Sequence, residues 1–269
     1  MTGLTVSLAQ IKVARSNPEE NLIKGESLIV EAARRGSDLI CFPEMWTTGF
    51  DWAANQRIAA QQERTIDRIA EMALRYHIWI NGSLLALDSS GKVANTSILF
   101  DAQGRQAGIY RKTHLFSFMH EDEHMAAGDS LCVVDTPWGK AGLSICYDIR
   151  FPELFRTCAL KGAKVQFLPM AFPYPRLPHW KVLVRARAIE NQMFVLGVNQ
   201  VGPEDFGTDG VVTYFGNSVI IDPWGETVIE AGESEEELLT ATIDIDMVDQ
   251  IRAKMHILQD RRPDLYELS

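Results

Sequence analysis

The sequence predicts an α/β fold in which two similar halves pack sheet on sheet and carry their helices on the outside. Strand-like and helix-like segments alternate along the 269 residues, and the order strand, helix, strand, helix and then several strands occurs twice. No long linker, low-complexity segment or block of like charge separates the halves. We therefore expect one domain over residues 1–269, with a core of about residues 1–245 and a C-terminal tail over about residues 255–269.

The first half opens with a strand at residues 4–11, followed by a helix with clear start and stop signals. Asn17 is a good N-cap and Glu20 is placed to complete a capping box. Pro18 suits the first turn, and Gly36 ends the helix. A buried strand is expected at residues 38–42, and a second helix at about residues 55–76. Three strands follow, at residues 77–87, at residues 93–101 and after the turn at residues 102–104.

The second half repeats this order. Pro152 fits the first turn of its first helix, which buries Leu154, Phe155 and Cys158. The expected strands lie at residues 131–135, 141–146, 164–169, 193–201, 215–222, 226–232 and 238–245. The expected helices lie at about residues 151–161, 178–191 and 247–255.

The charge balance restricts the partners of the chain. Lysine and arginine number 26 against 36 aspartates and glutamates, which gives a formal net charge of −10. This balance argues against nucleic acid, whose binding usually needs a basic face, and against an anionic membrane surface. No apolar run reaches the ~18 residues needed to span a bilayer, and the start lacks the pattern of a secretory signal. We expect a cytoplasmic protein with neither nucleic acid nor membrane as a partner.

The four cysteines suggest neither a zinc ribbon nor a disulfide framework. None belongs to a C-x-x-C pair, and in a cytoplasmic protein of this size they should be reduced. The ordinary expectation for each is a small buried side chain. They are Cys41, Cys132, Cys146 and Cys158.

Cys146 lies where a buried strand gives way to a tight connection and then a helix. This is a favoured place for a nucleophile, because the side chain projects from the edge of the sheet. Backbone N–H groups after such a turn can form an oxyanion hole. The preceding residues do not match G-x-S-x-G, and Ser144 would point away or be buried, so a serine-hydrolase elbow is rejected. On these residues alone, a nucleophile and a core cysteine are equally good interpretations.

Two other ionisable residues follow predicted strands. Glu44 comes just after the strand at residues 38–42, and Lys112 comes just after the strand that follows residue 104. If the strand ends meet at one rim, both would lie beside Cys146. A carboxylate could act as base towards the thiol, and an ammonium could stabilise a thiolate and an oxyanion. Taken singly, each is more simply a solvated residue at a strand end.

The stretch His120 to His124 reads HEDEH and matches the zinc-peptidase pattern H-E-x-x-H. That pattern needs a helix, so that the two histidines share a face. Helix signals are poor here, since Gly128 follows soon and no amphipathic repeat surrounds the stretch. No third ligand is evident either. We favour loop histidines over metal ligands and expect no metal, with a zinc peptidase as a remote alternative.

Three segments, CFPEM, YRKTHLF and SICYDIRFPEL, together resemble the Glu, Lys and Cys motifs of the nitrilase superfamily of carbon–nitrogen hydrolases, in that family's order and roughly its spacing. The resemblance covers nearly the whole chain and includes HWKVLVRARAIENQMFV in the second half. It implies a four-layer αββα sandwich, commonly dimerised into an eight-layer assembly, with no metal or organic cofactor. It also implies that the C-terminal tail packs across a partner subunit of a homodimer or higher homo-oligomer.

The resemblance also assigns catalytic residues. They are Glu44, Lys112, Cys146 and a second glutamate, which maps best to Glu121 and has Glu123 as its rival. HEDEH then belongs to the loop after the lysine strand.

The implied mechanism is a two-step hydrolysis. The Cys146 thiolate attacks an amide carbonyl, and Lys112 and the backbone N–H of Tyr147 hold the oxyanion. Glu44 protonates the leaving amine to give a thioester, and then deprotonates the water that releases the acid. Glu121 holds Lys112 and the substrate amide in place.

The flanks of the motifs look most like the omega-amidase branch of the superfamily. Members of that branch hydrolyse the terminal amide of 2-oxo dicarboxylic monoamides such as 2-oxoglutaramate or 2-oxosuccinamate, and release ammonia. Such a substrate has a carboxylate, for which arginine is the ideal partner. The candidate substrate-binding residues are Phe116, Arg150, Phe172, Tyr174 and Arg176.

Alternatives within the superfamily are a deaminated-glutathione amidase, an N-carbamoyl hydrolase and a true nitrilase. A non-catalytic interaction protein is the alternative from another class. The presence of all four catalytic residue types in this chain weighs against it.

Overall fold

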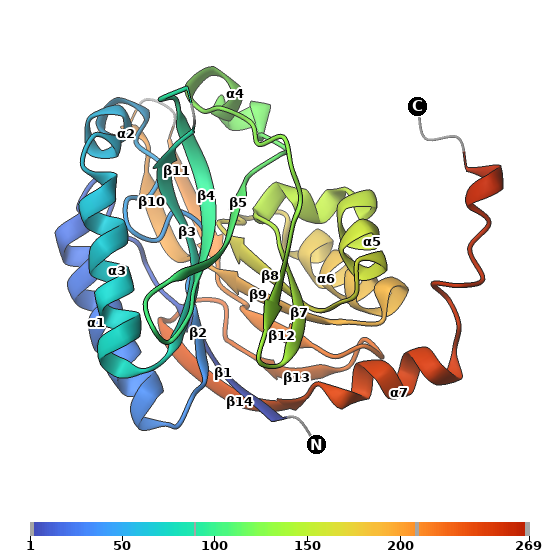
Figure 1. Ribbon diagram of the computed structural model, residues 1–269. Helices are drawn as coiled ribbons and strands as arrows, with labels where there is room; N and C mark the ends of the chain where they lie inside the picture. Colours follow the sequence, from blue (N-terminus) through green and yellow to red (C-terminus); the bar gives the residue numbers. More distant parts are fainter. Residues whose placement is uncertain (1–2, 89, 208–209, 267–269) are drawn as a thin grey trace.

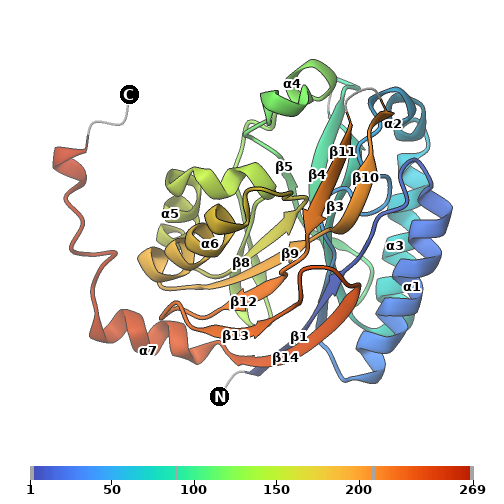
Figure 2. The same cartoon turned by 180° about the vertical axis from the view of Figure 1, so that it is seen from behind.

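The structure, a computed structural model, describes residues 3–88, 90–207 and 210–266. It contains two six-stranded sheets packed against each other, with helices on both outer faces (Figure 1). On one side lie α1 (Pro18–Arg34) and α3 (Gln62–Tyr76), and on the other α5 (Pro152–Leu160) and α6 (Leu177–Asn191), an arrangement that Figure 2 shows from behind. The predicted αββα sandwich is therefore confirmed.

The first sheet has the strand order β14-β1-β2-β3-β4-β5. Its strands are β1 (Gly3–Gln10), β2 (Leu39–Cys41), β3 (Trp79–Leu87), β4 (Val93–Phe100), β5 (Gln106–Arg111) and β14 (Glu237–Asp244). The pairs β1–β2 and β2–β3 are parallel, and the other pairs are antiparallel. Because β14 pairs with β1, the end of the second half completes the sheet of the first half.

The second sheet has the strand order β13-β12-β9-β8-β7-β6. Its strands are β6 (Cys132–Thr136), β7 (Gly139–Leu143), β8 (Ala163–Met170), β9 (Phe194–Asn199), β12 (Val219–Ile221) and β13 (Thr227–Glu230). The pairs β7–β8 and β8–β9 are parallel. A separate antiparallel pair, β10 (Val201–Asp205) and β11 (Val211–Phe215), was not predicted from the sequence as a hairpin.

Alternation along β2 shows why its sequence is apolar throughout. Leu39 and Cys41 pack into the core between the two sheets, whereas Ile40 packs on the other face among the residues under α1 and α3. Successive strand residues point to opposite faces, so a strand between a sheet and a helix layer is buried on both. Burying one such aliphatic side chain contributes about 1.5–3 kcal/mol.

The first helix has the predicted signals. Asn17 caps α1 by accepting a hydrogen bond from the backbone N–H of Glu20, and Pro18 occupies the first turn. The reciprocal half of the capping box differs, because the Glu20 carboxylate accepts from the Asn17 side-chain amide instead of its backbone. Gly36 follows the helix with a φ of +77°, a conformation that favours glycine.

The expected single helix over about residues 55–76 is wrong. The chain forms α2 (Trp52–Ala59), which Asp51 caps, and then α3, with a break at residues 60–61. Neither glycine nor proline marks this break, so the sequence pattern carried no stop signal for it.

The chain ends with α7 (Asp246–Lys254), close to the expected helix, and a segment that extends away from the body of the molecule (Figure 1). Leu265 and Tyr266 in this segment are largely exposed. Within the part of the chain that the structure describes, no helix is both long and apolar enough to cross a membrane.

Candidate active site

The fold brings three separate chain segments to one rim of the sandwich. Glu44 follows β2, Lys112 directly follows β5, and Cys146 lies three residues beyond the end of β7. The predicted strand at residues 141–146 is shorter than expected, and Cys146 instead begins the 3₁₀ helix η2 (Cys146–Arg150). Parallel strands of both sheets thus end at this rim, which is the usual position of sites in α/β proteins.

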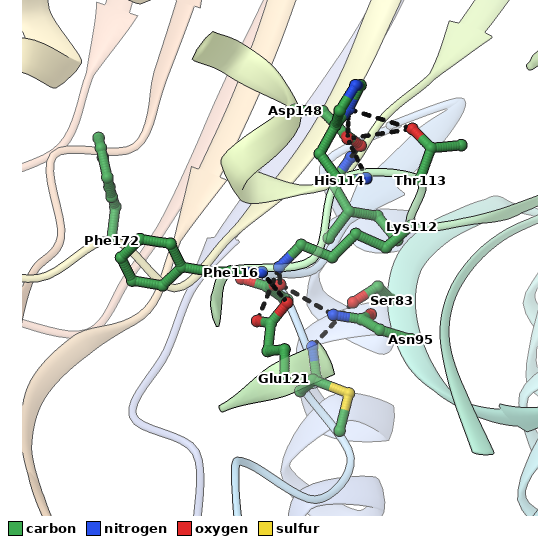
Figure 3. Close-up of polar contacts among 12 residues, drawn as sticks. Ser83, Asn95, Lys112, Thr113, His114, Phe116, Glu121, Asp148 and Phe172 are labelled. Atoms are coloured by element: carbon green, nitrogen blue, oxygen red, sulfur yellow. Dashed lines mark hydrogen bonds and ion pairs between the residues drawn. The ribbon is translucent and has the colours of Figure 1, made fainter. Parts of the chain in front are cut away.

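Lys112 lies between two carboxylates. Its Nζ is 2.8 Å from Glu44 Oε1 and 2.8 Å from Glu121 Oε1. Figure 3 shows the Lys112 side chain extending towards Glu121. The three side chains are 0–3% exposed. Burial by itself lowers the pKa of Lys112, but the two carboxylates outweigh it and hold the pKa well above its ordinary value. The lysine is therefore a permanent cation inside the protein.

The two oxygens of Glu44 have different surroundings. Oε1 accepts hydrogen bonds from Lys112 and from the side-chain amide of Asn95, at 2.8 Å each. Oε2 is buried and accepts no hydrogen bond from a nitrogen or hydroxyl group in the described part of the protein, and the Cys146 thiol interacts with this carboxylate. Burial raises the pKa of Glu44, and the Lys112 charge opposes that shift. One oxygen is thus fixed, and the other is available to accept a proton.

The backbone around Glu44 is held from both sheets. Its N–H donates to the carbonyl of Met170 at 3.1 Å, and its own carbonyl accepts from Gln200 Nε2 at 2.8 Å. The next residue, Met45, has a φ of +50° and donates its N–H to Ser83 Oγ at 2.9 Å. These contacts fix the direction of the Glu44 side chain.

Cys146 is 8% exposed and has a φ of +45°, in the left-handed region that side chains rarely adopt. Burial raises the pKa of its thiol well above the ordinary value, and the Glu44 charge adds to the rise while Lys112 opposes it. The resting thiol is therefore neutral. Tyr147 follows in the first turn of η2, where backbone N–H groups have no acceptor within the helix.

The structure separates the two candidate glutamates of the HEDEH stretch. Glu121 is buried beside Lys112, and its Oε2 accepts the backbone N–H of Phe116 at 2.9 Å. Glu123 is 64% exposed and contacts the His120 ring. Only Glu121 joins the buried cluster.

The two histidines of that stretch do not share a helix face. His120 precedes the single-turn helix α4 (Glu121–His124) with a φ of +59°, and its Nδ1 lies 2.8 Å from Glu123 Oε1. The His124 ring stacks on Trp52 with centroids 5.0 Å apart. Among the described residues, no group of three His, Cys, Asp or Glu side chains is arranged to hold a metal ion.

Aromatic side chains wall the pocket that opens onto Cys146. Its lining comprises Glu44, Phe50, Phe116, Met119, Glu121, Cys146, Tyr147, Ala171, Phe172, Pro173 and Arg176. Figure 3 shows the rings of Phe116 and Phe172 on the same side of the Lys112 cluster. The pocket is thus apolar at its walls and charged at its base.

The predicted substrate-binding residues fall into two groups. Phe116, Phe172 and Arg176 line the pocket, and the Arg176 guanidinium lies over the Phe116 ring at 5.6 Å. Arg150 is not among the lining residues, although it lies over the Phe172 ring at 5.3 Å. Tyr174 is not brought into the pocket, because it is 43% exposed and its hydroxyl donates to Glu233 at 2.7 Å.

Several residues in or beside this site were not predicted from the sequence. They include Asn95, Gln200, Met119 and Asp148. Asn95 offered a signal, since an amide in the middle of an otherwise buried strand is uncommon and needs a partner.

Comparisons with known proteins agree with this geometry. The family model for carbon-nitrogen hydrolase matches residues 5–253. The chain is 36% identical over 263 residues to the 2-oxoglutaramate amidase of Bacillus subtilis, covering 97% of this chain and 99% of the relative. It is 33% identical to omega-amidase NIT2 of Xenopus tropicalis, covering 100% and 98%. A carbon-nitrogen hydrolase of Helicobacter pylori G27 has the same fold, with a TM-score of 0.91 at 24% identity over 98% of this chain and 97% of that one.

Proposed function

The chain belongs to the carbon–nitrogen hydrolase family and is an amidase of the nitrilase superfamily, and on this premise we propose its catalytic residues and substrate. It cleaves the terminal carboxamide of a small 2-oxo acid, with 2-oxoglutaramate as the first candidate and 2-oxosuccinamate as the second. Cys146 is the nucleophile, Glu44 the acid and base, Lys112 the oxyanion partner and Glu121 the residue that holds Lys112. No metal or organic cofactor takes part.

One observation carries this proposal. A buried ammonium is held between two buried carboxylates, and a neutral thiol lies beside them at the base of one pocket. Burying charges is costly unless they are paired, so a cluster of this kind is seldom found without a functional reason.

In the first step, the thiol proton passes to Glu44 Oε2 as the Cys146 sulfur bonds to the amide carbon. The carbonyl electron pair moves onto the oxygen, which accepts hydrogen bonds from Lys112 Nζ and the Tyr147 N–H. Collapse of this intermediate breaks the C–N bond. Glu44 gives its proton to the departing nitrogen, which leaves as ammonia, and a thioester remains.

In the second step, water occupies the position that ammonia left. Glu44 takes one proton from this water as its oxygen bonds to the thioester carbon. Collapse expels the Cys146 sulfur, which recovers a proton from Glu44, and the acid is released. Lys112 keeps its charge because Glu121 contacts its ammonium throughout, and the oxyanion adds a negative charge while Glu44 carries the proton.

Substrate class follows from the relatives and from Arg176. Two relatives are named for 2-oxoglutaramate or omega-amide hydrolysis. Arg176 lines the pocket and lies over Phe116, and it forms no ion pair with any carboxylate in the described part of the chain. A guanidinium in this setting can bind a substrate carboxylate in bidentate fashion.

The test is ammonia release from 2-oxoglutaramate by the intact chain and by Cys146→Ala, both in EDTA. The proposal requires activity that only the substitution abolishes. Activity that survives Cys146→Ala would overturn the mechanism, and activity lost to EDTA in the intact chain would overturn its independence of metal. If the intact chain released no ammonia, the substrate assignment would be wrong, and N-carbamoyl and glutathione-like amides would be tested next.

Arg176 is tested separately with Arg176→Gln and with a neutral amide of similar length. We expect KM for 2-oxoglutaramate to rise by ~10- to 100-fold, the equivalent of a lost charged hydrogen bond, with little change for the neutral amide. An equal loss on both substrates would assign Arg176 a structural role. Arg150→Gln is the matched control, because Arg150 lies outside the pocket lining.

The assembly and compartment belong to the same proposal. We expect a cytoplasmic homodimer, which is consistent with the four free cysteines and with the exposed tail carrying Leu265 and Tyr266. Deleting residues 261–269 and measuring the mass in solution tests the role of the tail. A dimer unchanged by the deletion would refute it.

A further inference from the structure

We propose that Asp148 is a positioning residue that sets the Cys146 sulfur relative to the Lys112 ammonium. The inference rests on the proposed function of this site and adds a residue to it. Asp148 is fully buried and lies in η2, two residues after Cys146. Its carboxylate contacts both the segment that carries the thiol and the segment that carries the lysine.

On the side of the thiol, Asp148 closes the turn around Cys146. Its Oδ2 accepts the backbone N–H of Ile145 at 2.8 Å, and its own N–H donates to the carbonyl of Ile145 at 3.0 Å. The left-handed Cys146 lies between these two hydrogen bonds. Such a conformation persists only where its surroundings hold it, and here the Asp148 side chain supplies one of the two bonds.

On the side of the lysine, the same carboxylate holds residues on either side of Lys112. The Tyr110 hydroxyl donates to Oδ2 at 2.7 Å, and His114 Nδ1 lies 2.7 Å from Oδ1. Figure 3 shows Asp148, Thr113 and His114 joined beside the Lys112 side chain. Because Tyr110 and His114 are each two residues from Lys112, they fix the backbone from which the lysine extends.

The chemistry of these contacts requires a carboxylate. Backbone N–H groups of Ile145 and His114 and the hydroxyl of Tyr110 all present a hydrogen to Asp148, and an ionised carboxylate only accepts. An asparagine of the same shape would turn an NH₂ group towards one of these donors. One of the two segments would then lose its anchor while the core volume stays the same.

The experiment compares Asp148→Asn with Asp101→Asn. Asp101 is also a buried carboxylate that closes a turn, accepting the N–H groups of Gln103 and Arg105 at 2.9 Å each, but it lies at the other end of β4 and β5. We expect Asp148→Asn to lower kcat by about 10²-fold with little change in KM, which is the effect of a small misplacement of reacting groups. Asp101→Asn should lower thermal stability and leave kcat unchanged.

A second readout does not depend on the substrate. The rate of iodoacetamide alkylation at Cys146, located by peptide mass, should fall by a similar factor in Asp148→Asn, because the sulfur no longer lies where Glu44 takes its proton. If no variant hydrolyses the chosen amide but the alkylation rate still falls, the substrate assignment fails and the positioning role stands. A folded Asp148→Asn with unchanged kcat and alkylation rate would overturn the inference.

Two milder substitutions keep the test open if Asp148→Asn does not fold. Tyr110→Phe and His114→Gln each remove one contact to Asp148, and the His114 side chain is partly exposed, so its variant should fold. Each should lower kcat and the alkylation rate together, and the paired variant should lose less than the product of the two single effects. Fully independent effects would show that the two contacts do not act through Asp148, and a loss of stability alone would assign these residues to the fold only; either outcome would contradict the inference.

Discussion

Replacing Glu121 by glutamine perturbs the Lys112 cluster without changing its volume. Glu121 now accepts from two donors, Lys112 Nζ and the Phe116 N–H. Glutamine has one acceptor oxygen, so its NH₂ group must face one of these donors. Lys112 also loses one of the two negative charges that hold its pKa high. The substitution therefore weakens both the position and the charge of the proposed oxyanion partner.

The expected loss follows from the strength of the bond that is removed. A hydrogen bond to a charged group contributes about 1.5–3 kcal/mol, which corresponds to a roughly 10- to 150-fold fall in kcat/KM. Glu123→Gln provides the matched control. It is the same substitution two residues away, at a carboxylate that is 64% exposed and contacts the neighbouring His120 ring. A surface contact of this kind contributes little.

The assay is ammonia release across a range of substrate concentrations, with thermal unfolding of each variant measured in parallel. Glu121→Gln should fold, retain most of its substrate affinity and lose turnover. The reasoning fails if Glu121→Gln turns over as fast as the intact chain, or if Glu123→Gln is impaired to the same degree.

Two further predictions concern acidity and packing. Burial and the Glu44 charge both raise the pKa of the Cys146 thiol. Glu44→Gln should abolish turnover, because the acid and base is lost, and should lower the pH at which the alkylation rate of Cys146 increases, because a negative charge near the thiol is removed. An unchanged or higher midpoint of that pH profile would contradict the assigned electrostatics. A side chain added at Gly128 would place Cβ 2.2 Å from the Arg111 carbonyl oxygen. Gly128→Ala should therefore lower the free energy of unfolding, measured with denaturant, by about 1–3 kcal/mol. Gly3→Ala is the control and should be tolerated, because its Cβ would meet one atom at 3.5 Å.

The sequence was most informative where a candidate catalytic residue directly follows a predicted strand. Glu44, Lys112 and Cys146 each follow a predicted strand, and parallel strand ends meet at a common rim. Most strands and helices were therefore placed correctly from local sequence signals, although the β10–β11 pair was missed. The element order also suggested two sheets packed together with helices outside, and the resemblance of whole motifs added the αββα family fold and the second glutamate.

What could not be predicted depends on contacts between distant segments. The break between α2 and α3 has no local signal, and the pairing of β14 with β1 joins residues more than 200 positions apart. Asp148 belongs to the SICYDIRFPEL motif, yet its importance becomes visible only from the contacts that Tyr110 and His114 make with its carboxylate. Tyr174 looked like a pocket residue by its position in the chain, but its hydroxyl reaches Glu233 at the surface.

The charge of the cluster explains why a neutral thiol suits the proposed reaction. Two carboxylates surround one ammonium, so the resting site already carries one excess negative charge in a buried volume. A free Cys146 thiolate would add a second, and the raised pKa of the thiol expresses that cost. Attack on an amide removes the difficulty, because the proton neutralises Glu44 while the new negative charge forms on an oxygen beside Lys112. On this argument, the sulfur loses its proton as it attacks the carbonyl carbon, and the resting thiol should react slowly even with alkylating reagents small enough to enter the pocket.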